Sequence, residues 1–306
     1  MTDALRSALA ARLTCEVRYG EPLARHTTYR IGGPATALVL PGLADDVAAA
    51  LRFATESGTN WLVLGLGSNV LVADRGFDGI VVKIGKGLDR VVRDGPEGSR
   101  WTVGAGLPIP ILARQSAAAG HAGVQRLIGV PGTVGGGVYM NTGAHGQDFS
   151  GVTRAVDVVE PTGTLRRVAG KEIPWRYRSS GLESLVVVAA TVELEPGDIA
   201  RTQQELALYL KKRKEGTPFD EPCCGSVFRN PEERTAGQLI DAADLKGFRV
   251  GGAEVSRMHG NYIVNTGGAT AADVRVVMET VRERVRDRFG VALEPEVKLI
   301  GFVEGG

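Results

Sequence analysis

The chain has 306 residues, of which 43% are hydrophobic and 23% charged, values typical of a globular protein with two or three domains. Its 36 basic and 35 acidic residues give a formal net charge of +1, so no broad basic field favours nucleic acid or a membrane surface. No apolar run reaches the about 18 residues that a membrane span needs. Cys15, Cys223 and Cys224 form no C-x-x-C pair, which favours a reducing compartment over a disulfide scaffold.

Strand and helix signals in the N-terminal part of the sequence predict a β-α-β unit of about 70 residues. Apolar and β-branched runs predict strands at residues 35–40, 61–64, 79–84, 101–103, 152–161, 165–168 and 185–194. Helical spacing predicts a helix that begins near Leu43 and ends at Gly58. A second helix is expected over residues 107–119, because Pro108 and Pro110 are well placed in a first helical turn.

The tripeptide Pro196-Gly197-Asp198 is rich in turn formers and predicts a boundary. Beyond it we expect helices over 199–214, 236–243 and 270–289, and a final strand from Val297 to Val303. In the last helix Thr270 and Asp273 form an N-terminal capping pair, and Gly290 stops the helix. The apolar stripe of this helix predicts a core-facing side made of Val274, Val277, Met278, Val281, Val285 and Phe289.

A glycine-rich stretch from Gly129 to Gly143 is the most informative feature of the chain. Glycine has no Cβ, so it admits positive φ and lets another group approach the backbone. We expect the stretch to form a concave turn with exposed N–H groups, which suits a phosphate or pyrophosphate. A glycine-rich turn that serves only the fold is the alternative.

Two further glycine patches strengthen the phosphate interpretation. Gly65-Leu66-Gly67-Ser68-Asn69 directly follows a predicted strand, a position where nucleotide phosphates often bind. This patch is not a G-x-G-x-x-G motif, because Val70 occupies the place of the third glycine. Ile31-Gly32-Gly33-Pro34 lies upstream. The three patches together predict one large diphosphate ligand held at several points.

Three short segments carry candidate catalytic groups, each with a structural alternative. Arg178, in Tyr177-Arg178-Ser179-Ser180, could bind a carboxylate in two-point geometry or be a surface arginine. Ser226 could donate a proton or merely shape a turn. Glu296, at the start of the last strand, could act as an acid or stabilise charge, or be a plain strand-edge glutamate. The four histidines show no metal spacing and predict no metal site.

Six segments, in this order along the chain, resemble the UDP-N-acetylenolpyruvoylglucosamine reductase family of flavoproteins. Any one of them is a weak signal, whereas all six in order are specific, and they span about residues 20–302. The segments are Thr28-Tyr29-Arg30-Ile31-Gly32-Gly33-Pro34-Ala35, Leu64-Gly65-Leu66-Gly67-Ser68-Asn69, Val130-Pro131-Gly132-Thr133-Val134-Gly135-Gly136, Tyr177-Arg178-Ser179-Ser180, Gly225-Ser226-Val227-Phe228 and Leu293-Glu294-Pro295-Glu296-Val297.

The resemblance implies an α+β (mixed α/β) protein with an FAD-binding fold of the p-cresol methylhydroxylase and vanillyl-alcohol oxidase type. Residues 1–85 would form FAD-binding subdomain 1, to which residues 291–306 return. Residues 86–196 would form subdomain 2, and residues 197–290 the substrate domain. FAD would be tightly but non-covalently bound, by Ile31, Gly32, Gly33, Gly65, Gly67, Ser68, Asn69, Pro131, Gly132, Thr133, Gly135, Gly136, Asn141 and Gly143.

The implied reaction reduces UDP-N-acetylglucosamine enolpyruvate to UDP-N-acetylmuramate for peptidoglycan synthesis. NADPH gives a hydride to FAD, and flavin N5 then gives it to C3 of the substrate. By motif match, Arg178 and Glu296 would stabilise the developing enolate and Ser226 would protonate C2. Tyr177, Lys214 and Asn230 fall at substrate-contact positions. The short connection between Arg178 and Ser226 resembles the family group without an extra tyrosine-bearing loop.

Two other functions are compatible with the same residues. An FAD oxidase on this fold would use oxygen as acceptor, and a UDP-sugar-binding module would need no catalytic side chains. For the reductase we expect a cytoplasmic monomer that binds NADPH and the enolpyruvyl sugar nucleotide, without a nucleic-acid or membrane partner.

Overall fold

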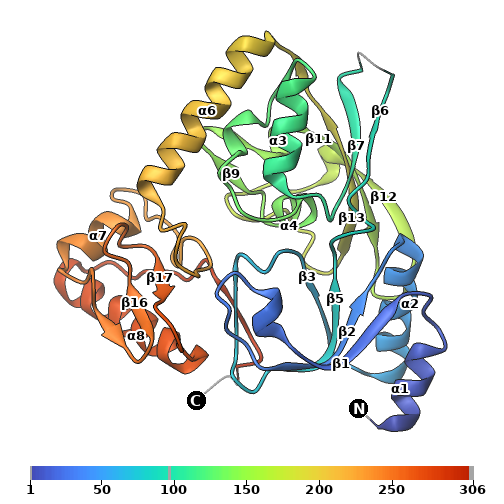
Figure 1. Ribbon diagram of the computed structural model, residues 1–306, viewed down its shortest axis with the longest axis horizontal. Coiled ribbons are helices and arrows are strands. Elements are labelled where there is room, and N and C mark those ends of the chain that lie inside the picture. Colours follow the sequence, from blue (N-terminus) through green and yellow to red (C-terminus); the bar gives the residue numbers. More distant parts are fainter. Residues whose placement is uncertain (1, 96–97, 303–306) are drawn as a thin grey trace. The chain divides into compact units, whose positions relative to one another are not determined.

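The computed structural model describes residues 2–95 and 98–302, which form two compact units (Figure 1). Unit 1 contains Met1–Tyr19, Thr36–Leu66 and Gly79–Lys212. Unit 2 contains Gly20–Ala35, Gly67–Asp78 and Arg213–Gly306. Each unit is thus assembled from three separate stretches of the sequence.

A four-stranded sheet, most of which belongs to unit 1, has the strand order β1-β2-β5-β3. Its strands are β1 (Glu16–Pro22), β2 (Pro34–Leu40), β5 (Phe77–Lys83) and β3 (Trp61–Leu64). Strands β3 and β5 are parallel, with Leu64 opposite Lys83. Helix α2 (Ala44–Ser57) joins β2 to β3 and ends at Gly58, whose φ of 63° suits glycine. The β-α-β unit predicted here is confirmed, whereas β1 and the N-terminal helix α1 (Asp3–Ala10) were not predicted.

A second, antiparallel sheet of unit 1 has the order β12-β11-β13-β7-β6. Its strands are β12 (Leu165–Ala169), β11 (Thr153–Val159), β13 (Val186–Glu193), β7 (Arg100–Gly104) and β6 (Val91–Arg93). The strands predicted near 101–103, 152–161, 165–168 and 185–194 are therefore confirmed. Helix α3 (Ile109–Ala118) confirms the proline-started helix.

Contrary to the prediction, the glycine-rich stretch is not a turn over its whole length, because its middle is helical; its phosphate-binding role stays a prediction. Residues Val134–Tyr139 form a short helix, α4, which packs against β13 and β7. Its glycines permit close packing, because a methyl group on Gly135 would lie 2.7 Å from Ala105 Cβ, and one on Gly137 would collide with the Phe149 ring. Glycine has a poor helix propensity, and tight tertiary packing here overrides it.

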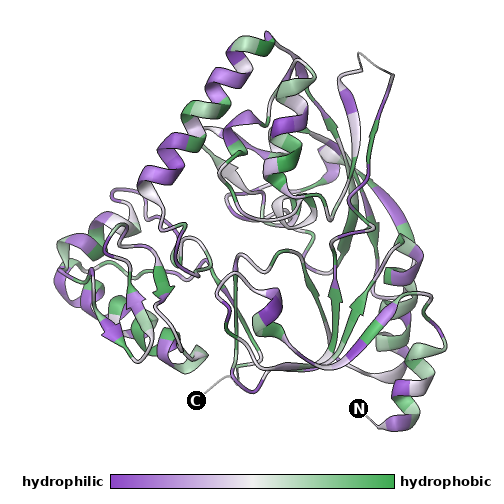
Figure 2. Ribbon diagram, in the orientation of Figure 1, coloured by the Kyte–Doolittle hydropathy of each residue, from purple (hydrophilic) through white to green (hydrophobic). Residues whose placement is uncertain are grey.

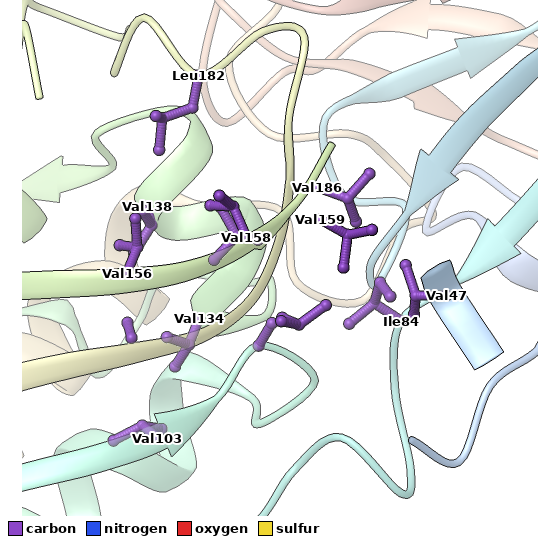
Figure 3. Close-up of a cluster of buried hydrophobic side chains, with 14 of the residues drawn as sticks. Val47, Ile84, Val103, Val134, Val138, Val156, Val158, Val159, Leu182 and Val186 are labelled. Carbon is purple, nitrogen blue, oxygen red and sulfur yellow. The ribbon is translucent and has the colours of Figure 1, made fainter. Parts of the chain in front are cut away.

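One hydrophobic core joins the elements of unit 1. Figure 3 shows valines of α4 and β11 converging with Val103 of β7 and Ile84 beyond β5. Trp101, in β7, is fully buried in the same cluster. Burying one such aliphatic side chain contributes about 1.5–3 kcal/mol, so the cluster fixes the loops that leave these strands.

Unit 2 has a separate core around α7 (Ala236–Ala242) and α8 (Ala271–Phe289). Both helices begin with a capping box, which confirms the pair Thr270 and Asp273. Of the predicted stripe, Phe289 is partly buried and the other five residues are fully buried. A three-stranded sheet of β15 (Arg249–Val250), β16 (Ala253–Val255) and β17 (Ile263–Asn265) packs with α8.

The last strand predicted from the sequence is shorter than expected. Strand β18 (Lys298–Ile300) pairs in parallel with β4 (Val70–Val72) within unit 2, and Val303 lies outside the described residues. Helix α6 (Ile199–Gly216) is confirmed, and it is largely hydrophilic in Figure 2, with Thr202 as its buried residue. In the described ranges no helix is both long and apolar enough to cross a bilayer.

Short elements complete the two units. They are η1 (Leu23–His26), β8 (His121–Ala122), η2 (Gln125–Leu127), β9 (Gly143–Ala144), β10 (Gln147–Asp148), α5 (Phe149–Val152), η3 (Gly170–Glu172) and β14 (Glu195–Pro196).

Candidate active site

Thr133, in unit 1, has a buried hydroxyl that the fold does not use. Thr133 is the N-cap residue of α4, yet its side chain makes no capping hydrogen bond. Its Oγ1 is buried without a partner in the described structure. A methyl group on Gly65 would lie 2.6 Å from this oxygen. Since buried polar groups are normally paired, an unpaired hydroxyl beside a glycine fits a ligand that supplies the missing partner.

The other predicted cofactor residues of unit 1 surround Thr133 in sequence. Gly132 is buried, and its carbonyl accepts a hydrogen bond from Ile109 N at 3.0 Å. Gly136 is exposed although the rest of its helix is mostly buried. Pro131 is half-buried, and Gly143 lies in β9 close to the main chain of β10. The segment therefore combines tight main-chain packing with one exposed glycine.

Arg178 lies in a tight turn with an unusual backbone conformation. Arg176 N donates to Ser179 O at 2.9 Å, and Ser179 N donates to Arg176 O at 3.2 Å. Arg178 has a φ of 57°, a region that costs a non-glycine residue about 1–2 kcal/mol. Its guanidinium lies 4.9 Å from the centroid of the Tyr177 ring, and Tyr177 is 55% exposed. Strain of this kind concentrates at functional sites.

Asn141 links the glycine-rich segment to this turn. Its side chain donates to Arg176 O at 3.1 Å and accepts from Ser150 N at 3.0 Å. Ser180, which is fully buried, donates from its hydroxyl to Tyr139 O at 2.8 Å. The Asn141 side chain thus has a structural task, and the predicted contact of Asn141 with FAD stays a prediction.

Ser226 and Glu296 lie on two main-chain segments of unit 2 that hydrogen-bond to each other. Val227 O accepts from Glu296 N at 2.8 Å and from Val297 N at 3.3 Å. Arg229 N donates to Glu294 O at 2.9 Å. Two candidate residues 70 positions apart in the sequence are therefore held on adjacent strands of backbone.

Two asparagines fix these segments. Asn69 donates from Nδ2 to Glu296 O at 3.2 Å, and its own carbonyl accepts from Lys298 N at 3.0 Å. Asn261 is 2% exposed and clamps Phe228, with Oδ1 accepting from Phe228 N at 2.9 Å and Nδ2 donating to Phe228 O at 2.8 Å. The sequence analysis missed Asn261, and the signal was a polar residue just before the apolar run 262–264.

The glycine patch at Gly32 and Gly33, in unit 2, is shaped by backbone packing. Gly33 N donates to Ala73 O at 3.0 Å, and a methyl group on Gly32 would lie 2.9 Å from Val72 Cβ. Ile31 is buried, and its carbonyl accepts from the Thr27 hydroxyl at 2.9 Å. The structural explanation of these glycines therefore holds whether or not they touch a cofactor.

Within unit 2, Thr28 links the glycine patch at Gly67 to the segment that precedes Ser226. Gly67 O accepts from Thr28 N at 3.1 Å, and the Thr28 hydroxyl donates to Cys223 O at 2.6 Å. Gly67 has a φ of 71° and is buried, whereas Ser68 is half-buried. Within unit 2 this arrangement connects the predicted cofactor loop to the segment that leads to Ser226.

Two of the predicted substrate-contact residues, Lys214 and Asn230, are exposed, and the side chain of Asn230 also makes a hydrogen bond within the protein. Lys214 is exposed near the C-terminal end of α6. Asn230 is exposed, and its side-chain oxygen accepts from Ala236 N at 3.1 Å, where α7 begins. Asn230 therefore stabilises a helix start, and its predicted substrate contact stays a prediction.

Cys224 is not placed for nucleophilic chemistry. It is 1% exposed, and burial raises the pKa of its thiol, so the thiol stays protonated near neutral pH. Burial likewise raises the pKa of Tyr29, which lies beside Cys224. In the described part of the chain no three His, Cys, Asp or Glu side chains are grouped as metal ligands would be.

Two family models match the chain. Residues 35–169 match the FAD binding domain, and residues 217–300 match the C-terminal domain of UDP-N-acetylenolpyruvoylglucosamine reductase. The reductase of that name from Halalkalibacterium halodurans is 42% identical, over 98% of this chain and 99% of its own. The one from Bacillus subtilis (strain 168) is 39% identical, over 96% and 97%.

Solved structures agree with these matches. UDP-N-acetylenolpyruvylglucosamine reductase from Thermus caldophilus has a TM-score of 0.80 and 31% identity, over 94% of this chain and 99% of its own. The glucose dehydrogenase Phl p 4.0202 shares the fold alone, with a TM-score of 0.50 and 14% identity over 64% of this chain and 45% of its own. The fold is an FAD-binding fold of the p-cresol methylhydroxylase and vanillyl-alcohol oxidase type, and the chain is an oxidoreductase that belongs to the UDP-N-acetylenolpyruvoylglucosamine reductase family.

Proposed function

We propose that this chain uses NADPH and FAD to reduce UDP-N-acetylglucosamine enolpyruvate to UDP-N-acetylmuramate, a step in the synthesis of peptidoglycan precursors. Family membership supports the overall reaction. The observation that carries the residue assignment is the main-chain pairing of the Ser226 and Glu296 segments. Free thiols at Cys15, Cys223 and Cys224 support a cytoplasmic site of action.

FAD would be held by the glycine-rich segments, with Thr133 Oγ1 as the side-chain group that best fits this role. The hydroxyl is buried and unpaired in the described structure, so a ligand acceptor or donor would remove an unfavourable burial. Gly65 and Gly136 leave room beside it for a bulky group. Bound FAD supplies the hydride that NADPH delivers and that C3 of the substrate receives.

Arg178 and Glu296 would act on the charge that develops on the enolpyruvyl carboxylate. A guanidinium binds a carboxylate through two parallel N–H groups. This interaction becomes stronger as enolate charge develops on the carboxylate. The strained turn presents Arg178 in a fixed backbone conformation. Hydrogen bonds from Asn69 and to Val227 similarly fix the backbone of Glu296.

Ser226 would donate the proton that completes the reaction. The hydride forms a new C–H bond at C3, the carbon–carbon double bond is lost, and the Ser226 hydroxyl forms the second C–H bond at C2. The serine then recovers its proton from water. Tyr177, Lys214 and Asn230 would contact the sugar nucleotide, with Lys214 favouring its negative diphosphate.

The visible absorption spectrum of the purified protein tests this proposal. We expect a flavin spectrum, colour in the supernatant after acid precipitation, and NADPH oxidation that depends on the enolpyruvyl sugar nucleotide. Colour in the acid pellet, with oxygen consumption on reduction, would instead indicate a tethered-flavin oxidase. A protein that takes up FAD but shows no substrate-dependent NADPH oxidation would contradict the reductase.

A further inference from the structure

Lys83 is a half-buried cation that no predicted motif includes. It is the last residue of β5 and lies opposite Leu64, the last residue of β3. Gly65 follows Leu64 directly, and Lys83 Nζ donates a hydrogen bond to Gly65 O. The ammonium group is therefore joined to the first residue of the glycine loop that leaves the sheet.

The Lys83 charge has no counter-charge among the residues that the structure describes. Among the described residues no Asp or Glu side chain forms an ion pair with it, and the Gly65 carbonyl is its hydrogen-bond acceptor. Burial lowers the pKa of Lys83 to about 8. Removing part of a charge from water is costly unless the charge is paired, so a carbonyl alone compensates this half-buried ammonium incompletely.

The same glycine lies beside the Thr133 hydroxyl, which is unpaired in the described structure. Thr133 is 6% exposed, and its Oγ1 has no partner in the described structure. A methyl group on Gly65 would lie 2.6 Å from that oxygen. Among the described residues, a cation without an anion and a hydroxyl without a partner thus border one residue of unit 1. An anionic ligand with several acceptor oxygens would satisfy both groups.

We propose that Lys83, held by the Gly65 carbonyl and accompanied by the Thr133 hydroxyl, supplies the positive charge that binds the diphosphate of FAD. The inference takes its ligand from the proposed function, and it assigns the electrostatic part of cofactor binding to one side chain. Main-chain N–H groups alone carry only partial charges. A lysine ammonium adds a full charge at the loop and makes charge-assisted hydrogen bonds, which are stronger than neutral ones.

The affinity for FAD, measured by quenching of flavin fluorescence on binding to the deflavinated protein, tests this role. We expect Lys83→Met to weaken FAD binding by about 10- to 100-fold, the range of a lost hydrogen bond to a charged group. Lys83→Arg keeps the charge and should stay within about tenfold of wild type. Lys86→Met, three residues further along and exposed, is the matched control and should leave the affinity unchanged.

Competition by ADP identifies the part of FAD that Lys83 binds. ADP carries the diphosphate without the flavin, so its inhibition constant against FAD should weaken by the same factor in Lys83→Met. An unchanged FAD affinity in this variant would overturn the inference. So would a weakened FAD affinity with unchanged ADP competition, because Lys83 would then act on the flavin ring.

Two further results separate a folding role from the binding role. If Lys83→Met lowers the melting temperature of the FAD-free protein and Lys83→Arg does not restore FAD affinity, Lys83 only supports the loop and the inference fails. Wild-type protein that binds FAD with the expected Lys83 dependence, yet does not reduce the enolpyruvyl substrate, would contradict the proposed function and leave this inference standing.

Discussion

In unit 2 the segments that carry Ser226 and Glu296 are hydrogen-bonded to each other and clamped by Asn69 and Asn261. In unit 1 the groups around the glycine-rich segment are left unsatisfied, with Thr133 Oγ1 unpaired and Lys83 without a counter-charge among the described residues. The first arrangement is satisfied by the protein itself, whereas we propose that the second is completed by bound FAD. On the proposed roles, groups that act in catalysis are held rigidly in unit 2, and groups that bind the cofactor are left partly unsatisfied in unit 1.

Arg178 is the clearest exception to this difference between the two units. It belongs to unit 1, yet it is held in a strained turn by main-chain bonds and by Asn141. Arg178→Lys should lower the rate of flavin reoxidation by the substrate about 10²- to 10³-fold, the loss typical of one group that stabilises an oxyanion. Single-turnover stopped-flow absorbance measures this rate. Arg176→Lys, at an exposed position of the same turn, should change it less than threefold.

Arg178→Gly separates strain from function at the same position. Glycine adopts positive φ without the steric cost that arginine meets. We therefore expect the variant to be inactive in the second half-reaction and to unfold at the same or a higher urea concentration than wild type. A clear loss of stability would mean that the Arg178 side chain holds the turn together.

Asn261→Ala tests the rigid side of the comparison. The change leaves the buried main-chain N–H and C=O of Phe228 without partners, which costs about 1–3 kcal/mol for each unsatisfied group. Urea denaturation should show a loss of about 2–4 kcal/mol in the free energy of unfolding. Asn60→Ala, at an exposed asparagine, should change this free energy by less than about 0.5 kcal/mol. Equal losses of unfolding free energy in Asn261→Ala and Asn60→Ala would contradict a stabilising role for the Asn261 hydrogen bonds.

Two substitutions at Asn141 separate the contributions of backbone strain and of hydrogen bonding to the free energy of unfolding. Asn141 has a φ of 40°, which glycine tolerates and alanine does not. Asn141→Gly removes the bonds to Arg176 and Ser150, and we expect it to cost about 1–2 kcal/mol. Asn141→Ala should cost about 1 kcal/mol more, because it adds the strain. Urea midpoints that coincide for the two variants would rule out a strain contribution.

Lys83 is tested through the pH dependence of stability, with an expected gain of about 2 kcal/mol between pH 8 and 10. Burial places the folded-state pKa near 8, below the ordinary value of 10.5, so between these values the unfolded chain binds more protons than the folded one. The free energy of unfolding of the FAD-free protein should therefore gain a contribution as pH rises from 8 to 10. Lys83→Met should lack this contribution, and identical pH profiles for wild type and variant would contradict the burial of a charged group.

Local patterns of the sequence predicted the regular elements well, for physical reasons that can be named. The stripe from Val274 to Val285 and the cap at Thr270 are local signals, so they predict α8 without knowledge of its tertiary contacts. The helix α4 could not be predicted in this way, because its glycines have poor helix propensity. The helix depends on contacts with Ala105 and Phe149, which are distant in sequence or belong to another element.

The candidate site was predictable to a similar, limited extent. Ordered motifs identified Ser226, Arg178 and Glu296 as candidates, but only the fold shows that the segments of Ser226 and Glu296 pair. Asn261 and Lys83 carry no motif, since one acts through a buried main-chain clamp and the other through a contact between neighbouring strands. The three-part domain division and the monomeric state stay predictions.

Anaerobic stopped-flow measurement of the two half-reactions in Ser226→Ala tests the central assignment most directly. We predict that NADPH reduces the flavin of the variant at a rate within about threefold of wild type. Oxidation of the reduced flavin by the enolpyruvyl sugar nucleotide should slow by about 10²- to 10⁴-fold, the usual contribution of a positioned acid. Equal slowing of both half-reactions, or wild-type rates in both, would contradict the role of Ser226 as the proton donor.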